Sequence, residues 1–178
     1  MESLIPPAGV AIEYAYALGA VGLAAEWRAY ALPARRSFQY WSALGALLWA
    51  AQYLCLGAPT AGLTMAATAA RTWCAGWQGL ALGRGVQAAA FSALFAVLTA
   101  CSWQGWVSLL PAFAVTNTTL ALYFLHNRSM RMALLASSAG WIWNDWYWQA
   151  WPALAAESAA VLINLRTIVR LRRDADAA

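Results

Sequence analysis

Lysine is absent from this 178-residue chain, histidine occurs once, and only 10% of the residues are charged. A soluble domain of this size carries about 25% charged residues. Without lysine the chain cannot form an internal Schiff base, which excludes retinal attachment. Since His126 is the single histidine, zinc or haem cannot be held by several histidines. No cofactor and no metal are therefore expected.

Cysteine is also scarce, and the motifs of common enzyme classes are missing. Cys55, Cys74 and Cys101 are odd in number and scattered through apolar segments, which is typical of small core residues. The chain has no serine elbow, no glycine-rich phosphate loop and no cluster of metal ligands. These absences predict that it is not an enzyme. The N-terminal stretch MESLIPPAG lacks basic residues, which predicts that no signal peptide is cleaved.

Hydrophobic residues, by contrast, make up 63% of the chain and recur in long runs separated by short polar or Pro/Gly stretches. Runs of about 20 residues are long enough to cross a hydrocarbon core of roughly 30 Å. They predict an all-α integral membrane protein with a single transmembrane domain of seven helices. We expect these helices at about 10–32, 38–56, 59–82, 86–102, 107–126, 130–149 and 152–171.

The eleven basic residues are all arginines, and their places between the apolar runs indicate a topology. They form no interleaved basic surface suited to nucleic acid. The connections after the first, third and fifth predicted helices carry arginine, whereas those after the second, fourth and sixth carry none. By the positive-inside rule the N-terminus lies outside and the C-terminus in the cytoplasm of a bacterial inner membrane. The arginines concerned are Arg35, Arg36, Arg84, Arg128, Arg131, Arg170, Arg172 and Arg173.

The chain aligns with itself at an offset of 92 residues. RRSFQYWSALGALLWAAQ falls on NRSMRMALLASSAGWIWN, which pairs Trp49 with Trp141 and Gln52 with Asn144. The third and seventh helices follow after a small insertion, at an offset of 95 or 99; chance matching of alanine-rich helices is the alternative. The pattern predicts a 3+1+3 bundle of two parallel repeats, a known transporter plan. The repeats cover about 10–82 and 107–171, joined by a linker helix at 86–102 and followed by a short cytoplasmic tail, 172–178.

The segments LLPAF, RSMRM, GWIWNDW and AAESAAVLINLRTIVRLRR resemble the bacterial YgjV-type inner-membrane family over residues 107–173, with a weaker echo at AARTW. That family is similar to the PQ-loop/SWEET-like group, whose three-plus-one-plus-three bundles move sugars, amino acids or related solutes. The resemblance therefore implies the same bundle and a solute of this kind. The chain lacks a Pro-Gln dipeptide and has Thr68 where the group would have asparagine. The residues at the family's spacing are Pro111, Met130, Arg131, Trp141, Glu157, Asn164 and Arg170.

Five ionisable side chains inside the predicted helices form a candidate charge network, because charges within a span are costly and usually functional. At 1.5 Å per residue, Glu26, Arg71 and Arg166 fall in the inner half of the membrane, and Asp145 and Glu157 near its outer surface. We expect Glu26 to pair with Arg71. The alternative is that this pair only locks the bundle, since buried ion pairs are weak evidence for function.

Tryptophan is concentrated in WIWNDWYWQAWP, residues 141–152, which is expected to be both a membrane anchor and the wall of a site. Trp148 and Trp151 fall at headgroup depth, where tryptophan anchors helices. Trp141 lies deeper and is predicted to share a helix face with an amide three residues on. The aligned residues of the first repeat form a second pair of this kind. Two such pairs, each a tryptophan and an amide, could hold a planar or sugar-like solute. The predicted substrate-binding set is Trp49, Gln52, Asn117, Trp141, Asn144 and Asn164.

These features predict a small-solute transporter or permease whose two repeats rock about a central polar and aromatic site. The alternative is a non-transporting membrane subunit that packs against a partner complex or lipid; an intramembrane enzyme or receptor is a third reading. The lipid bilayer is the expected partner, and a membrane protein partner or a homo-oligomer stays open. A central cavity would favour a transporter, whereas a dry, closed centre would favour a packing subunit.

Overall fold

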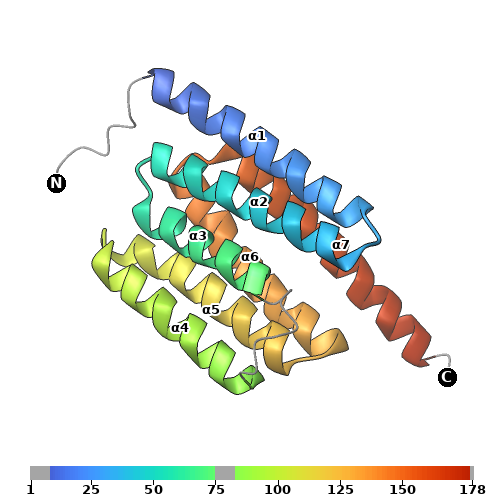
Figure 1. Cartoon of the computed structure of the whole chain (residues 1–178). Helices are drawn as coiled ribbons and strands as arrows, with labels where there is room; N and C mark the ends of the chain where they lie inside the picture. Colours follow the sequence, from blue (N-terminus) through green and yellow to red (C-terminus); the bar gives the residue numbers. More distant parts are fainter. Residues whose placement is uncertain (1–8, 75–82, 177–178) are drawn as a thin grey trace.

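The computed structural model describes residues 9–74 and 83–176, and within these ranges the chain forms seven α-helices and no strand (Figure 1). The all-helical prediction is confirmed, and each predicted helix corresponds to one observed helix. The end of the third predicted helix, 75–82, lies outside the described residues. The helices are α1 (Gly9–Ala31), α2 (Arg35–Cys55), α3 (Pro59–Cys74), α4 (Arg84–Cys101), α5 (Leu109–Phe124), α6 (Asn127–Tyr147) and α7 (Trp151–Asp176), with a short 3-10 helix, η1 (Trp106–Ser108), before α5.

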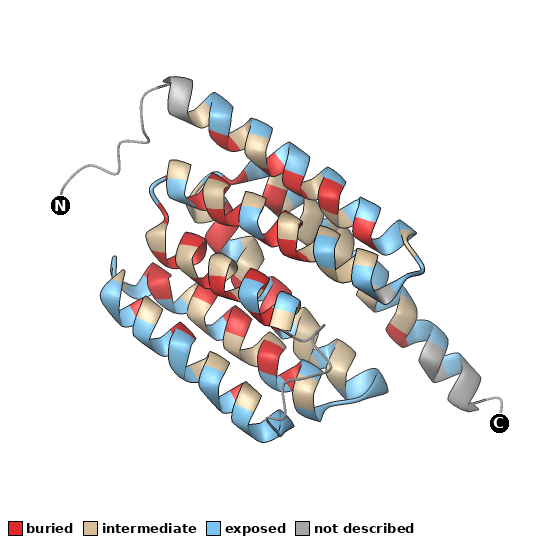
Figure 2. Ribbon diagram, in the orientation of Figure 1, coloured by how far each residue is buried: buried red, intermediate tan, exposed pale blue. Residues whose placement is uncertain are grey.

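The outer surface of the bundle is apolar, as expected of a protein in lipid. Large side chains such as Trp27, Val97 and Trp146 are more than half exposed, and the outward helix faces are largely exposed while the buried residues lie inside (Figure 2). A soluble bundle would not expose so continuous an apolar surface. Among the described residues, three helical stretches are long and apolar enough to cross a membrane: Arg84–Cys101, Trp106–Phe124 and Trp151–Arg170.

Six of the helices contact one another in a closed ring. α1 packs on α2, α2 on α3, α3 on α5, α5 on α6, α6 on α7, and α7 returns to α1. α4 lies outside this ring, against α3 and α5 (Figure 1). α7 continues to Asp176, beyond the predicted end at 171, because no proline or glycine follows to end the helix.

Small residues let neighbouring helices approach closely. Gly22 of α1 lies against Leu48 of α2, and a Cβ there would be 3.3 Å from the leucine Cβ. Gly140 of α6 lies against α5, where a Cβ would be 3.2 Å from the Leu110 carbonyl oxygen and 3.5 Å from the Ala114 Cβ. In membranes, such small residues replace the hydrophobic effect as the basis of helix packing, because close backbones gain van der Waals contact.

Two turns of the chain share one backbone conformation. After α2, Gly57 has φ 75°, and the Ala58 N–H donates to the Tyr53 carbonyl oxygen at 2.9 Å. After α6, Gln149 has φ 54°, and the Ala150 N–H donates to the Asp145 carbonyl oxygen at 2.8 Å. The two turns are 92 residues apart. The insertion predicted before the third and seventh helices is therefore absent from this turn, and the offset of 92 carries through it.

Candidate solute-binding cavity

A cavity of about 1180 Å³ lies inside the bundle and is lined by residues of all seven helices. Ligand pockets commonly measure roughly 300–1,000 Å³, so the cavity has room for a small solute. Along α2 the lining runs from Phe38 to Tyr53, which at 1.5 Å per residue is about 22 Å. The cavity therefore extends along most of the thickness of a hydrocarbon core of about 30 Å.

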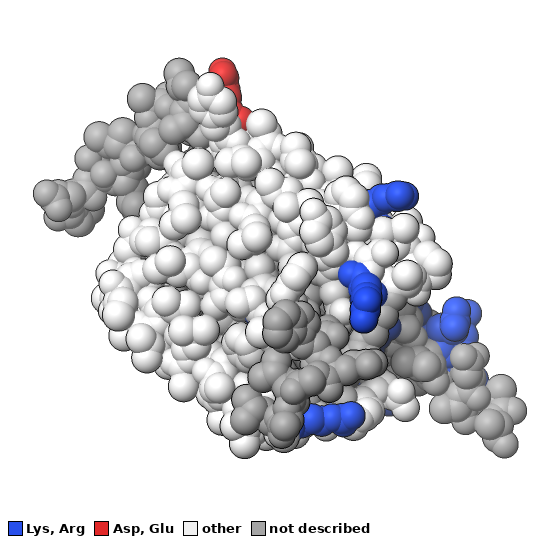
Figure 3. All heavy atoms as spheres, viewed as in Figure 1, with Lys and Arg blue, Asp and Glu red and all other residues white. Residues whose placement is uncertain are grey.

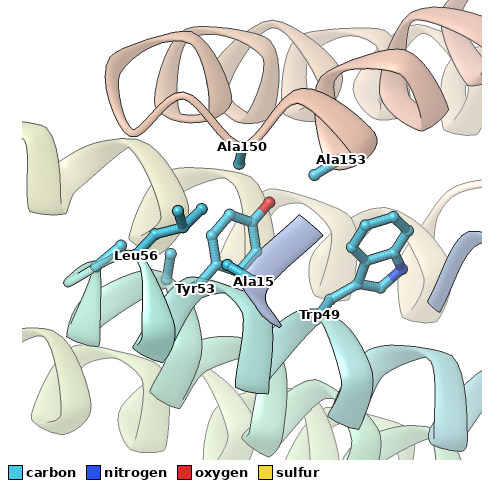
Figure 4. Close-up of a cluster of buried hydrophobic side chains, with 8 residues drawn as sticks. Ala15, Trp49, Tyr53, Leu56, Ala150 and Ala153 are labelled. Atoms are coloured by element: carbon cyan, nitrogen blue, oxygen red, sulfur yellow. The ribbon is translucent and has the colours of Figure 1, made fainter. Parts of the chain in front are cut away.

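One end of the cavity is closed by contacts between α2 and α6. The Tyr53 hydroxyl donates to Asp145 Oδ1 at 2.6 Å. The Tyr53 ring also stacks on Trp141, with ring centroids 5.7 Å apart and an angle of 18° between the planes. Figure 4 shows Trp49 and Tyr53 projecting from α2 toward the chain that carries Ala150 and Ala153. The surrounding buried side chains, mostly alanines, fill the remaining space at this end: Ala15, Leu56, Ala58, Ala61, Ala150 and Ala153.

The opposite end of the cavity reaches the surface. Its lining includes Arg84, His126 and Asn127, which are exposed. The arginine atoms visible on one face of the molecule gather toward this end, where α1 meets α2, while the visible acidic atoms lie at the other end (Figure 3). The cavity thus opens among arginines and ends at the Tyr53–Asp145 contact.

Three carboxyl groups from three helices line the cavity: Glu26 of α1, Asp145 of α6 and Glu157 of α7. Asp145 accepts a second hydrogen bond in addition to that from Tyr53: Asn144 Nδ2 donates to its Oδ1 at 3.2 Å. Within the described part of the chain, uncharged groups alone hydrogen-bond these carboxyls.

The two glutamates illustrate this arrangement. The Glu26 carboxyl is hydrogen-bonded by the Trp49 indole and the Tyr30 hydroxyl. The Glu157 carboxyl is hydrogen-bonded by the Ser138 side chain. Glu157 lies near enough to act electrostatically on Glu26. An indole N–H or a hydroxyl carries no positive charge, so neither glutamate forms an ion pair with these partners.

Arg71 does not pair with Glu26, and that prediction is wrong. Its guanidinium is buried in the wall of the cavity, where Nη1 donates to the Thr119 hydroxyl of α5. Thr119 can accept this bond because its own proton is donated to the Val115 carbonyl oxygen at 2.7 Å. Arg166 is exposed and does not line the cavity. The five predicted members of the charge network therefore separate into three carboxyls, one arginine on a hydroxyl, and one arginine on the surface.

The predicted Trp-plus-amide pairs are also divided. Trp49 and Trp141 line the cavity, whereas Gln52 and Asn144 are fully buried and do not. Gln52 points at α1, where a Cβ on Gly19 would overlap its amide. Asn144 lies in a small recess with Pro111 of α5. Side chains three residues apart on a helix point about 60° apart, so the tryptophan faces the cavity while the amide faces a neighbouring helix.

The remaining two predicted amides connect helices instead of lining the cavity. Asn117 of α5 donates to the Ala133 carbonyl oxygen at 2.6 Å and to the Ser137 hydroxyl at 2.8 Å, both on α6. Asn164 of α7 accepts from Arg131 Nη1 of α6 at 2.7 Å. An amide within a span needs hydrogen-bond partners, and here neighbouring helices supply them. The prediction that Asn164 shares the cavity with Trp141 does not hold.

Tyr53 is the site residue that the sequence reasoning missed. It contributes both the hydrogen bond and the ring contact that close the cavity. The signal was present, because the offset that aligns Trp49 with Trp141 also aligns Tyr53 with Asp145. A tyrosine and an aspartate do not look alike in an alignment, although together they form one contact.

A helical bundle with an apolar exterior and a polar cavity among its helices defines an integral membrane protein. More narrowly, the chain belongs to the Imp-YgjV family, described as bacterial inner membrane protein, whose model matches residues 13–175. The resemblance to the YgjV-type family and the inner-membrane location are thus confirmed, whereas the similarity to the PQ-loop/SWEET-like group stays a prediction. No curated protein and no solved structure matches the chain.

Proposed function

We propose that this protein is a small-solute transporter of the bacterial inner membrane, in which two three-helix units move about the central cavity. The observation that carries the proposal is a polar cavity open at one end and closed at the other by Tyr53 and Asp145. A transporter working by alternating access must pass through such a one-sided state, with its site between two units. A packing subunit has no need of a solvent-reachable cavity of about 1180 Å³.

Repeated contacts support the 3+1+3 organisation. Gly45 of α2 faces Glu26 of α1, and the positions 92 residues later are Ser137 of α6 and Thr118 of α5, which hydrogen-bond at 2.9 Å. The ring of helices has the same character, because exchanging α1–α3 for α5–α7 converts the α3–α5 contact into the α7–α1 contact. A two-fold axis along the membrane normal has this effect on two parallel repeats.

The arginine distribution supports an inward-open state. Arg36, Arg84 and Arg128 belong to the end of the bundle at which the cavity opens. The positive-inside rule assigns that end to the cytoplasm. The closed end then faces outward, and its alanine-rich packing presents shallow surfaces that can separate without large side-chain rearrangements.

The experiment that tests the proposal measures access to Ala153, which is buried at the closed end and lines the cavity. In a chain with the three native cysteines replaced, Ala153→Cys is treated with a membrane-impermeant thiol reagent in vesicles of either orientation. We expect reaction from the arginine-bearing side, and also from the opposite side once Tyr53→Phe weakens the closure. Ala114→Cys, buried between α5 and α6 outside the cavity, is the matched control and stays unreactive.

Failure of Ala153→Cys to react from the closed side, in both the parent and the Tyr53→Phe background, would mean a cavity with one permanent opening. That result would reject the transporter and favour the non-transporting membrane subunit.

A further inference from the structure

Glu26 and Glu157 line the cavity, and neither forms an ion pair among the described residues. Glu157 lies near enough to act electrostatically on Glu26, and the partners of the two carboxyls in the described chain are an indole, a phenol and a hydroxyl. The described lining also holds Arg71 and Arg84, but neither is among the groups acting on the two glutamates. Carboxylates within a span are unfavourable without a positive partner. A bound cation would supply that partner.

The spacing of the carboxyls favours a large cation over a metal ion. Among the described residues, no group of three or more acidic, histidine or cysteine side chains is placed to hold a metal. Calcium and magnesium need oxygen ligands that converge at about 2.0–2.6 Å. Carboxyls that share a cavity without converging are suited to a cation whose charge is spread over several atoms.

Aromatic rings line the same region. Trp49 hydrogen-bonds Glu26 while its ring lines the cavity, so a cation held by this carboxylate lies beside the indole. One turn further along α2, Tyr53 stacks on Trp141 of α6. Indole and phenol faces attract alkylammonium groups within about 6 Å of the ring centroid. Carboxylates and aromatic walls together recognise an ammonium group with an apolar body.

Neutral and anionic solutes fit this lining less well. The amides predicted to hold a sugar, Gln52, Asn144 and Asn164, are turned away from the cavity. An anion would meet the repulsion of Glu26, Asp145 and Glu157. The sugar-like solute expected from the sequence therefore loses its predicted amide partners, although Gln39, Ser42 and Thr68 line the cavity, whereas a cation keeps the carboxyl groups as partners.

We infer that the cavity binds a small organic cation, an alkyl or quaternary ammonium compound, between Glu26, Glu157 and the rings of Trp49, Trp141 and Tyr53. The inference rests on the proposed function, since it names the solute class of the same cavity. The carboxylates select the charge of the solute, and the rings select its apolar body.

The test compares three probes that share one shape. Choline is the cation, 3,3-dimethyl-1-butanol is its neutral isostere, and glycine betaine adds a carboxylate. Binding to the purified full chain in detergent is followed by thermal stabilisation and by tryptophan fluorescence, with tetraethylammonium and benzylamine as further cations. We expect the cations to stabilise the protein and the neutral isostere to have no effect. Equal binding of choline and its isostere, or no binding of any cation, would overturn the inference.

Substitutions locate the binding. Glu26→Gln and Glu157→Gln are expected to weaken cation binding by roughly tenfold or more, as for loss of one partner of a buried charge pair. Glu157→Asp keeps the charge and should retain the preference for cations. Glu13→Gln, at an exposed glutamate of α1 outside the cavity, is the matched control and leaves binding unchanged. Unchanged affinity in both cavity variants would place the cation elsewhere and overturn the inference.

Folding of these variants is checked without ligand, where removing an unbalanced charge should not lower the melting temperature. Reconstituted vesicles then separate the two proposals. A cation that binds but does not cross the membrane would contradict transport and leave the binding site standing. A neutral solute that crosses while no cation binds would contradict the cation site and leave transport standing.

Discussion

Tyr53 and Asp145, which the offset of 92 residues aligns, hydrogen-bond to each other at 2.6 Å. Equivalent residues of two units related by a two-fold axis lie twice as far from each other as from the axis. Direct contact therefore puts this pair close to the axis of the proposed repeats. Each partner comes from a different unit, so separation of the units at this end must break the bond.

Tyr53→Phe should destabilise the protein by about 1–3 kcal/mol, because Asp145 then loses one of its two partners in a buried site. The phenylalanine ring keeps the stacking on Trp141, so the change isolates the hydroxyl. Asp145→Asn in the same chain should recover part of the loss. Unfolding in detergent measures both effects, and Tyr14→Phe, at an exposed position, is the control. Additive effects of the two substitutions would show that the hydrogen bond contributes nothing.

Arg71 and Thr119 should be energetically coupled, whereas Arg71 and Glu26 should not. The guanidinium donates to the Thr119 hydroxyl, and a hydrogen bond to a charged group contributes about 1.5–3 kcal/mol. In double-mutant cycles, Arg71→Ala with Thr119→Ala should show a coupling energy of that order. Arg71→Ala with Glu26→Gln should be additive within about 0.5 kcal/mol. A larger coupling to Glu26 would mean that the two cavity residues interact after all.

Gln52→Met should stabilise the protein. Both polar atoms of the Gln52 amide are buried without a hydrogen-bond partner among the described residues, and a buried unsatisfied group costs about 1–3 kcal/mol. Methionine has nearly the same length and no such group. Asn144→Leu is the contrast, since Asn144 Nδ2 donates to Asp145, and its loss should destabilise. A lower melting temperature for Gln52→Met would indicate that this amide has a partner in the membrane.

The two equivalent turns should respond to glycine in opposite ways. Gln149 has φ 54°, a left-handed conformation that costs a residue with a Cβ about 1–2 kcal/mol, so Gln149→Gly should stabilise. Gly57→Ala should destabilise by a similar amount, although no atom lies within 4 Å of the added Cβ. Gly85→Ala, in open space within α4, should stabilise instead through its higher helix propensity. Thermal unfolding measures all three, and the same sign for Gly57→Ala and Gly85→Ala would contradict the argument.

The end of the bundle that carries Arg36, Arg84 and Arg128 should face the cytoplasm, by the positive-inside rule. A cysteine at position 128, in a chain without other cysteines, should react with an impermeant reagent in inside-out vesicles only. Labelling in intact cells would reverse the orientation and make the cavity outward-open.

The number and places of the helices could be predicted from the sequence, because long apolar runs with Pro/Gly breaks are local features. The seven predicted segments match α1–α7 closely, and the tryptophans predicted to face inward, Trp49 and Trp141, do line the cavity. The offset of 92 residues likewise contained the Tyr53–Asp145 pair. The position of each residue along its helix follows from counting residues at 1.5 Å each, so the end of the bundle to which it lies nearer could also be predicted.

Which partner each polar side chain meets was decided only by the tertiary structure. Depth put Arg71 beside Glu26, but the rotation of α3 in the ring brings its guanidinium to Thr119. The amides of Gln52 and Asn164 lie within helices as predicted, yet they face neighbouring helices. Around a helix, one residue turns the side chain by about 100°, so the facing direction depends on how each helix is rotated against its neighbours. That rotation is set by packing contacts such as Gly22 against Leu48, which no single helix contains by itself.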